Sequence, residues 1–197
     1  MISIQELVGN TDIYLLDQIM KDRYKPNHKI LDAGCGGGRN LFWFLKNDIE
    51  IYGIDKNKTP VNYLKTAHSE SKERFIVADV ESLPFENNFF DHVISSAVLH
   101  FAKNTHHFKA MAQEMVRVLK TKGSLFIRMT SNIGIENKVH FIEDGVYTIP
   151  DGAERFLLTH SLLNEIMQEC NLSFIEPLKT VNVNDIRCMS TLMLQKE

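Results

Sequence analysis

The sequence predicts an α/β fold: a three-layer sandwich in which helices cover both faces of a seven-stranded, mostly parallel sheet. Short segments rich in Ile, Val, Leu and Phe, which are typical of strands, alternate with segments whose apolar residues recur every three or four positions. Crossover helices between parallel strands produce this alternation. With 197 residues, the chain has the size of a single domain with a substantial core.

The individual elements follow from these two periodicities. Strands are expected over 28–34, 49–55, 74–79, 90–96, 123–129, 172–181 and 187–195. Helices are expected over 12–23 and 40–46, from Thr59 onward, from Phe108 to near Gly123, and over 161–170. Thr59 should cap its helix, since Pro60 suits a first helical position. Only residues 182–186 separate the last two strands, so these should form an antiparallel hairpin beside the parallel strands.

The chain is expected to form one domain with four parts. Residues 1–27 form a helical cap, 28–129 the ligand-binding core, 130–158 an inserted segment, and 159–197 a helix and a hairpin. The inserted segment is far longer than a usual crossover loop. Long connections of this kind commonly close over a site or bind a substrate.

Composition excludes several classes of function. A net charge of -3 without a long basic run argues against a nucleic-acid partner. No window of about 20 residues is apolar enough to span a bilayer, and residues 1–24 lack the pattern of a signal peptide, so a cytoplasmic location is expected. Cys35, Cys170 and Cys188 are an odd number without a CxxC pair, which favours reduced thiols over disulfides or a zinc site.

A glycine-rich loop, ILDAGCGGGRN at 30–40, follows the first predicted strand. In open parallel sheets this is where ligands bind. The third glycine of a G-x-G-x-x-G dinucleotide motif is replaced by Arg39, which disfavours NAD, and the Gly-Lys-Ser/Thr of a phosphate-binding loop is absent. The loop therefore suits a ligand that approaches the backbone closely but carries no pyrophosphate.

Three successive predicted strands end in aspartate. Asp32 places a carboxylate beside the glycine loop, where it suits a cationic group. Asp55, about 20 residues further on, is placed to accept hydrogen bonds from two ribose hydroxyls. Asp79 is placed to accept a hydrogen bond from an exocyclic amine. Together the carboxylates favour a cationic nucleoside.

Four segments in order, ILDAGCGGGRN, IYGID, FIVADVESLPFENNFFDHVISSAVLHF and MVRVLKTKGSLFI, resemble the motifs of class I S-adenosylmethionine-dependent methyltransferases over roughly residues 28–130. The resemblance is to the small-molecule enzymes that include the ubiquinone-biosynthesis and tellurite-resistance types. It implies a Rossmann-like sandwich and transfer of a methyl group from S-adenosylmethionine to a small molecule, with S-adenosylhomocysteine as product. Thr121-Lys122-Gly123 replaces the usual Pro-Gly-Gly, which should alter a turn only.

The resemblance also implies roles for residues of the cofactor site. Asp32 would lie near the ammonium group of the methionine moiety, Asp55 would hold the ribose, and Asp79 would receive the adenine amine. The full set of cofactor-binding candidates is Asp32, Gly34, Cys35, Gly36, Asp55, Lys56, Asp79, Val80, Ser95 and Ser96.

Candidates for the acceptor side carry less motif information. His100 is the candidate general base, because the ordinary histidine pKa lies near neutrality. Arg128 is placed to bind an anionic acceptor. Tyr14, His140 and Tyr147 lie in segments that are able to close over the cofactor, as do Asp17 and His160.

Other chemistries find no support in the sequence. The adjacent pair His106-His107 points in two directions on a helix, and no acidic set matches the magnesium-dependent methyltransferases, so no metal is expected. The Pro-Pro-Tyr/Phe motif of DNA amino-methyltransferases and the Pro-Cys nucleophile of the pyrimidine C5 enzymes are both absent.

Two alternatives stay open at this point. One is a protein that binds S-adenosylmethionine and acts as a regulatory partner without turnover; the other, disfavoured by Arg39, is an NAD-dependent oxidoreductase. A monomer or a homodimer is expected. The sequence does not identify the methyl acceptor or its acceptor atom.

Overall fold

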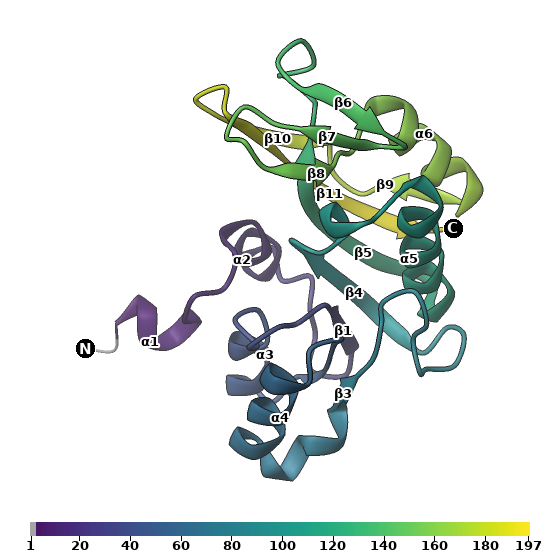
Figure 1. Ribbon diagram of the computed structural model, residues 1–197. Helices are drawn as coiled ribbons and strands as arrows, with labels where there is room; N and C mark the ends of the chain where they lie inside the picture. Colours follow the sequence, from purple (N-terminus) through teal and green to yellow (C-terminus); the bar gives the residue numbers. More distant parts are fainter. Residues whose placement is uncertain (1–2) are drawn as a thin grey trace.

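A central sheet with helices on both faces organises the computed structural model, which describes residues 3–197 (Figure 1). The strand order is β10-β11-β5-β4-β1-β2-β3, with β9 paired to β11. The strands β1 to β5 run parallel, and β11 is antiparallel to β5, β9 and β10. Their bounds are β1 Lys29–Ala33, β2 Glu50–Asp55, β3 Phe75–Val77, β4 Phe90–Ser96, β5 Leu119–Ser131, β9 Leu172–Phe174, β10 Lys179–Val183 and β11 Arg187–Lys196.

The predicted fold class is confirmed, including the antiparallel C-terminal hairpin of β10 and β11. The sheet has eight strands among the described residues instead of seven, since the segment 172–181 divides into β9 and β10. Pro177 lies in the interruption and lacks the N–H group that a ladder needs.

Two hydrophobic cores, one on each face of the sheet, lie between the sheet and the helices of the outer layers. Side chains alternate along each strand, so Leu31 joins one core and Ile30 the other. The helices α5 and α6 cover the first face, while α2, α3 and α4 cover the second. Their bounds are α1 Ile4–Val8, α2 Ile13–Met20, α3 Phe42–Lys46, α4 Lys58–Ala67, α5 Thr105–Val118 and α6 His160–Glu169, with 3-10 turns η1 Ser69–Arg74 and η2 Leu99–Phe101.

Several predicted element boundaries are wrong, and three of them bear on the site. α4 begins at Lys58, because Asn57, and not Thr59, accepts the capping hydrogen bond, which the Thr59 backbone N–H donates. The strand β3 ends at Val77, two residues before Asp79. The helix α5 ends at Val118, and β5 begins directly after it at Leu119, so no separate turn precedes the strand.

The inserted segment folds into a small antiparallel sheet of β6 (His140–Glu143), β7 (Val146–Thr148) and β8 (Glu154–Phe156). Its contact with the main core is firm, because the buried ring of Phe156 stacks on Phe108 with centroids 5.0 Å apart. The Leu158 backbone N–H donates to the carbonyl of Thr130 at 3.1 Å. This segment therefore lies beside the carboxyl end of β5.

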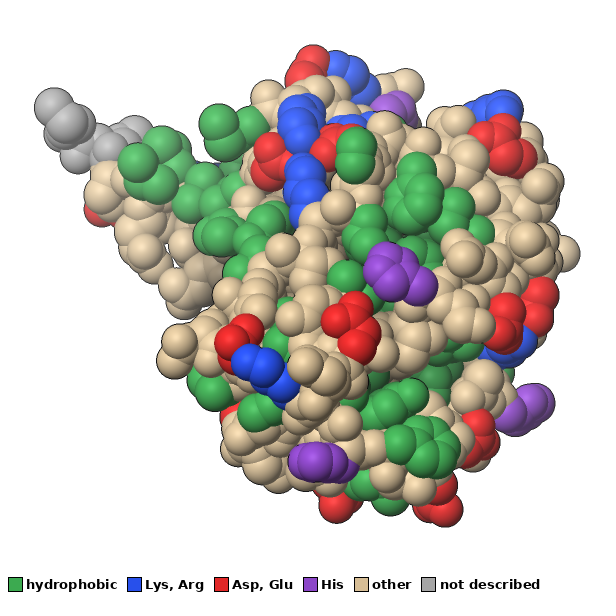
Figure 2. Space-filling model, turned by 90° about the horizontal axis from the view of Figure 1, so that it is seen from above, with side chains coloured by type: hydrophobic (Ala, Val, Ile, Leu, Met, Phe, Trp, Pro, Cys, Tyr) green, Lys and Arg blue, Asp and Glu red, His purple; other side chains and the backbone are tan. Residues whose placement is uncertain are grey.

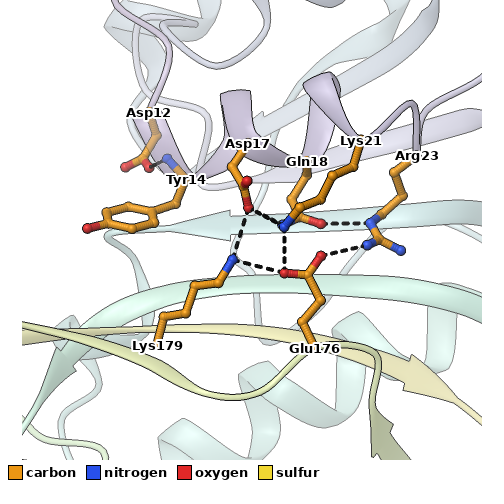
Figure 3. Close-up of polar contacts among 8 residues, drawn as sticks. All are labelled: Asp12, Tyr14, Asp17, Gln18, Lys21, Arg23, Glu176 and Lys179. Carbon is orange, nitrogen blue, oxygen red and sulfur yellow. Dashed lines mark hydrogen bonds and ion pairs between the residues drawn. The ribbon is translucent and has the colours of Figure 1, made fainter.

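An ion cluster ties α2 to the C-terminal hairpin (Figure 3). Glu176 pairs with Lys21, Arg23 and Lys179 at 2.8, 2.9 and 2.9 Å. Asp17 joins Lys21 and Lys179 at 2.7 and 3.0 Å. Burial alone would raise the pKa of Glu176, but the hydrogen bonds from the two lysines outweigh it and lower that pKa to about 2. The cluster holds α2 next to the sheet.

No helix within residues 3–197 combines the length and the apolar character that crossing a bilayer requires. The three cysteines are free thiols; Cys35 and Cys188 are buried and Cys170 is half-buried.

Candidate active site

The glycine loop between β1 and α3 is fastened to the end of β2. The backbone N–H groups of Gly34 and Cys35 both donate to the carbonyl of Ile54, at 2.9 and 2.8 Å. Gly34 has a φ of +88°, and a Cβ at this position would lie 2.4 Å from Cγ2 of Val98. Only glycine fits there, because both the left-handed backbone and the close approach exclude a side chain.

Asp55 at the end of β2 receives the loop. Its Oδ2 accepts from the Gly36 N–H at 2.9 Å and its Oδ1 from the Asn57 N–H at 2.8 Å. Each carboxylate oxygen keeps a further acceptor site. Two neighbouring hydroxyl groups of a ligand are able to use these sites together.

Asp32 at the end of β1 is 1% exposed, and its Oδ2 has no hydrogen-bond partner within residues 3–197. Burial raises the pKa of this carboxyl to about 7, the positive charge of Arg39 opposes the rise, and the negative charge of Asp55 adds to it. Asp32 does not line the cavities around the loop. A cationic group bound nearby would stabilise the ionised form of this buried carboxyl.

A cavity of about 270 Å³ lies along the ends of β2 and β3. Asp55, Lys56, Asp79 and Val80, all predicted for the cofactor, line it. Sequence reasoning did not single out its rim, where Glu81 pairs with His107 at 2.8 Å. The lining residues are Gly34, Asp55, Lys56, Ala78, Asp79, Val80, Glu81, Ala97, Val98, Phe101, Lys103, His107 and Met111.

A second cavity, of about 690 Å³, opens over the glycine loop and shares Gly34, Asp55 and Ala97 with the first. Cβ atoms built at Gly36 and Gly37 would meet nothing within 4 Å, so this space is open. Its lining residues are Gly9, Asn10, Gly34, Cys35, Gly36, Gly37, Gly38, Arg39, Phe42, Asp55, Ser96 and Ala97.

Asp12, at the start of α2, connects the glycine loop with β4 and β5. Its Oδ2 lies 3.5 Å from Nη2 of Arg39 and 3.2 Å from Nη1 of Arg128. Ser96 donates to Asp12 at 3.3 Å and accepts from Arg39 at 3.2 Å. This accounts for Arg39, which joins the glycine loop to α2. Ser95, which precedes Ser96 on β4, is 1% exposed, and its Oγ has no hydrogen-bond partner within residues 3–197. Ser95 lines neither of the two cavities.

A third cavity, of about 270 Å³, lies between β5, β8, β11 and η2. Ala97, whose φ is +63°, lines all three cavities. Ala97 therefore borders the two cavities around the glycine loop, called the cofactor-side cavities below, and also the third cavity. The residues lining the third cavity are Ala97, His100, Arg128, Thr130, Ile149, Asp151, Ala153, Arg155, Arg187 and Met189.

The domain family described as "Methyltransferase domain" matches residues 31–127. Residues 31–127 form a class I S-adenosylmethionine-dependent methyltransferase domain. The match ends at Ile127, so the inserted segment, β8 and β11 lie outside it.

Known relatives resemble this methyltransferase over parts of their length. The tRNA (carboxymethyluridine(34)-5-O)-methyltransferase of Arabidopsis thaliana is 35% identical over 98 residues, which is 50% of this chain and 23% of that protein. The chain spans about half or less of the other curated relatives that we compared.

Solved structures agree with the methyltransferase fold over almost the whole chain. The PH0226 protein of Pyrococcus horikoshii OT3 has a TM-score of 0.73 at 18% identity, covering 98% of this chain and 96% of that one. The 1,6-didemethyltoxoflavin-N1-methyltransferase of Burkholderia thailandensis, solved with 1,6-didemethyltoxoflavin and S-adenosylhomocysteine, has a TM-score of 0.69 at 16% identity, covering 96% and 79%. At these identities the likeness shows the fold.

The acceptor-side candidates of the methyltransferase lie in different places. His100, in η2, lines the third cavity and is 8% exposed. Burial lowers the pKa of His100 to about 4, and the charges of Arg155 and Arg128 lower it further, so the ring is neutral at pH 7. Arg128 also lines this cavity, and Tyr14 lies against it, with the guanidinium carbon 5.2 Å from the ring centroid.

The remaining candidates lie elsewhere. His140 is exposed on β6, and the Tyr147 ring packs on Phe141 with centroids 5.3 Å apart; neither lines the third cavity. Asp17 belongs to the ion cluster on α2. All of these roles stay predictions. Within residues 3–197, no group of three or more His, Cys, Asp or Glu side chains is arranged to hold a metal ion.

Proposed function

We propose that this chain transfers a methyl group from S-adenosylmethionine to a small-molecule acceptor. The observation that carries the proposal is that Ala97 borders three cavities, of which the first two are together lined by the glycine loop, Asp55 and Asp79. When bound, S-adenosylmethionine supplies a methyl carbon that its sulfonium charge makes electrophilic. The chain's own residues bind the cofactor, orient the two reactants and exclude water.

The residues fit this cofactor. Asp55 offers two carboxylate oxygens to the ribose hydroxyls, while Lys56, Asp79 and Val80 flank the space for the adenine. The open loop at Gly34–Gly38 accommodates the methionine moiety. The orphaned Oδ2 of Asp32 supplies the negative charge that the cationic cofactor favours.

Orientation and exclusion of water are the main contributions that we assign to the protein. Holding two reactants in line contributes up to about 7–11 kcal/mol in well-oriented reactions. A base is needed only when the acceptor loses a proton. The neutral, buried ring of His100 is suited to accept a hydrogen bond from such an acceptor, although a pKa of about 4 makes it a weak base.

A small molecule is the acceptor class that the third cavity supports best, since its volume is about 270 Å³. The relatives point to different acceptors: the Burkholderia enzyme is named for a small heterocycle and the Arabidopsis enzyme for a tRNA nucleoside. The net charge of -3 favours the small molecule. The cytoplasmic location and the monomeric or homodimeric state remain expectations.

Calorimetric titration with S-adenosylhomocysteine tests the cofactor assignment. The Asp55→Ala variant should bind at least tenfold more weakly than the unmodified chain, because hydrogen bonds to a charged group contribute about 1.5–3 kcal/mol. Glu70→Gln, on exposed η1, is the matched control and should bind normally. Equal affinities in all three proteins contradict the ribose assignment.

A product screen separates catalysis from the alternative of a regulatory partner that binds the cofactor without turnover. Incubation with S-adenosylmethionine and a broad metabolite extract should yield a methylated product. Tight cofactor binding without any product favours the regulatory alternative. A fluorescence titration with NADH should show no saturable binding, in keeping with Arg39 at the third glycine position.

A further inference from the structure

The third cavity is rich in arginine. Arg128, Arg155 and Arg187 line it together with a single carboxylate residue, Asp151. Arg128 is already paired, through Asp12 at 3.2 Å. Within residues 3–197, no carboxylate lies within 4.0 Å of the guanidinium nitrogens of Arg155 or Arg187. The half-buried Arg155 and the exposed Arg187 therefore form no direct ion pair among the described residues, and Asp151 is the one carboxylate that lines the cavity with them.

The strand register places these groups at different depths. The backbone N–H of Ala97 donates to the carbonyl of Arg128 at 2.8 Å, so Arg128 lies level with the cofactor end of the cavity. On the neighbouring strand, Met189 lies opposite Thr130, and Arg187 precedes Met189 by two residues on the same face. Arg187 is thus displaced from Arg128 by four residues along β5, about 13 Å at 3.3 Å per residue.

Arg155 occupies the space above η2. Its guanidinium carbon lies 5.3 Å from the centroid of the Phe101 ring, and its Nη1 donates to the carbonyl of Glu154 at 2.7 Å. These contacts fix the side chain but leave other N–H groups of the fork for a ligand. The buried Nδ1 of His100, which also has no partner within residues 3–197, belongs to the same lining.

We propose that Arg155 and Arg187 bind an oxyanion group of the methyl acceptor, a carboxylate or a phosphate, and so hold its reacting atom toward Ala97. This inference rests on the proposed function. Guanidinium groups bind both oxyanions through paired N–H donors. The acceptor is then a small organic anion whose charged end lies away from the cofactor.

The surface near the cavity favours a small anion over a polyanion. Figure 2 looks down on the side where β6, β7, β8 and the β10–β11 hairpin lie in Figure 1, and basic side chains there stand among acidic ones beside a hydrophobic area. Asp185 of the hairpin, for example, pairs with Lys138. A nucleic-acid backbone requires a broader basic surface.

Titration of the chain saturated with S-adenosylhomocysteine tests the proposal, with benzoate and inorganic phosphate as probes and benzamide as the uncharged counterpart of benzoate. Chloride at equal ionic strength corrects for screening. Benzoate or phosphate should bind, benzamide should not, and the tighter of the two anions identifies the oxyanion. Binding no stronger than that of chloride overturns the proposal.

Four variants complete the test. Arg155→Gln and Arg187→Gln should each weaken anion binding at least tenfold, and Arg187→Lys should recover only part of the loss, since lysine lacks the planar fork. Arg74→Gln, in η1, is the matched control and should bind the anion normally. The proposal is overturned if Arg155→Gln and Arg187→Gln bind the anion as tightly as the control Arg74→Gln.

The same titrations separate this inference from the proposed function. The affinity for S-adenosylhomocysteine should stay within twofold in all four variants, because these arginines line neither cofactor-side cavity. If the unmodified chain fails to bind S-adenosylhomocysteine, the proposed function is contradicted. The anion titration, repeated in the absence of S-adenosylhomocysteine, then still tests the two arginines.

Discussion

The two sides of Ala97 differ in charge and in motif content. On the cofactor side, Asp55, Asp79 and Glu81 line the space with Lys56 and Lys103, and Asp32 lies buried near the glycine loop. On the acceptor side, three arginines line the space with one carboxylate residue, Asp151. A cationic nucleoside suits the first environment and an anionic group the second.

This difference separates a shared reaction from an individual specificity. The family match covers residues 31–127, which hold Asp32, Asp55 and Asp79, and ends before the inserted segment and β11, which supply Arg155 and Arg187. Asp55 on the cofactor side is fixed by backbone hydrogen bonds at a strand end. Arg155 and Arg187 on the acceptor side come from β8 and β11, which lie later in the chain.

The largest expected effect is that of Gly34→Ala on the cofactor side. The new Cβ would lie 2.4 Å from Val98, at a backbone φ of +88°. Steric overlap and backbone strain together should lower the free energy of unfolding by about 2–5 kcal/mol. Urea unfolding measures the change. Gly37→Ala, where the added Cβ meets nothing within 4 Å, should cost no more than about 0.5 kcal/mol, and equal losses in both variants would show that the steric argument is wrong.

A smaller effect should distinguish the two sides by pH. Burial raises the pKa of Asp32 to about 7, so the carboxyl is increasingly protonated below pH 7, whereas the ammonium group of a bound S-adenosylhomocysteine favours its ionised form. Affinity for S-adenosylhomocysteine should therefore fall by up to about tenfold per pH unit as the pH drops from 7 to 5.5. Calorimetry in buffers of different ionisation enthalpy should detect the released proton.

The acceptor side provides the contrast in that experiment. Arginine does not titrate in this range, and the pKa of His100, about 4, lies below it, so benzoate binding should be flat between pH 7 and 5.5. Asp32→Asn should remove the pH dependence of cofactor binding. A dependence that persists in this variant would assign the titration to another group.

The smallest expected effect concerns the ion cluster that joins α2 to the hairpin. Glu176→Gln should lower the free energy of unfolding by about 0.5–1 kcal/mol at low salt, and less at high salt, because partly exposed ion pairs are weak and screened. Glu86→Gln, at an exposed position, is the control.

The pH dependence of this contribution has a defined sign. The folded pKa of Glu176, about 2, lies below its ordinary value of 4.5, so the stabilisation is present above pH 4.5 and is lost as the pH falls toward 2. Thermal unfolding across this range compares the two variants. A loss in Glu176→Gln that does not shrink in acid would contradict the ionic origin.

Sequence reasoning succeeded where local chemistry repeats along the chain. The position of Asp55 was predictable because it ends a buried strand about 20 residues after the glycine loop, and the structure places it on that loop through Gly36. Its role toward the cofactor stays a prediction. It failed for the cap of α4, where Asn57 and Thr59 are both good capping residues and the choice depends on the backbone path from β2.

The sequence by itself determined the parallel sheet, the glycine loop and the aspartates beside it, because these depend on strand periodicity and on residues close together in the chain. The tertiary structure alone decided the pairing of Arg39 with Asp12 and the meeting of Arg128, Arg155 and Arg187 at one cavity. The reason is physical: those side chains belong to segments distant in sequence, and only strand register and packing bring them together.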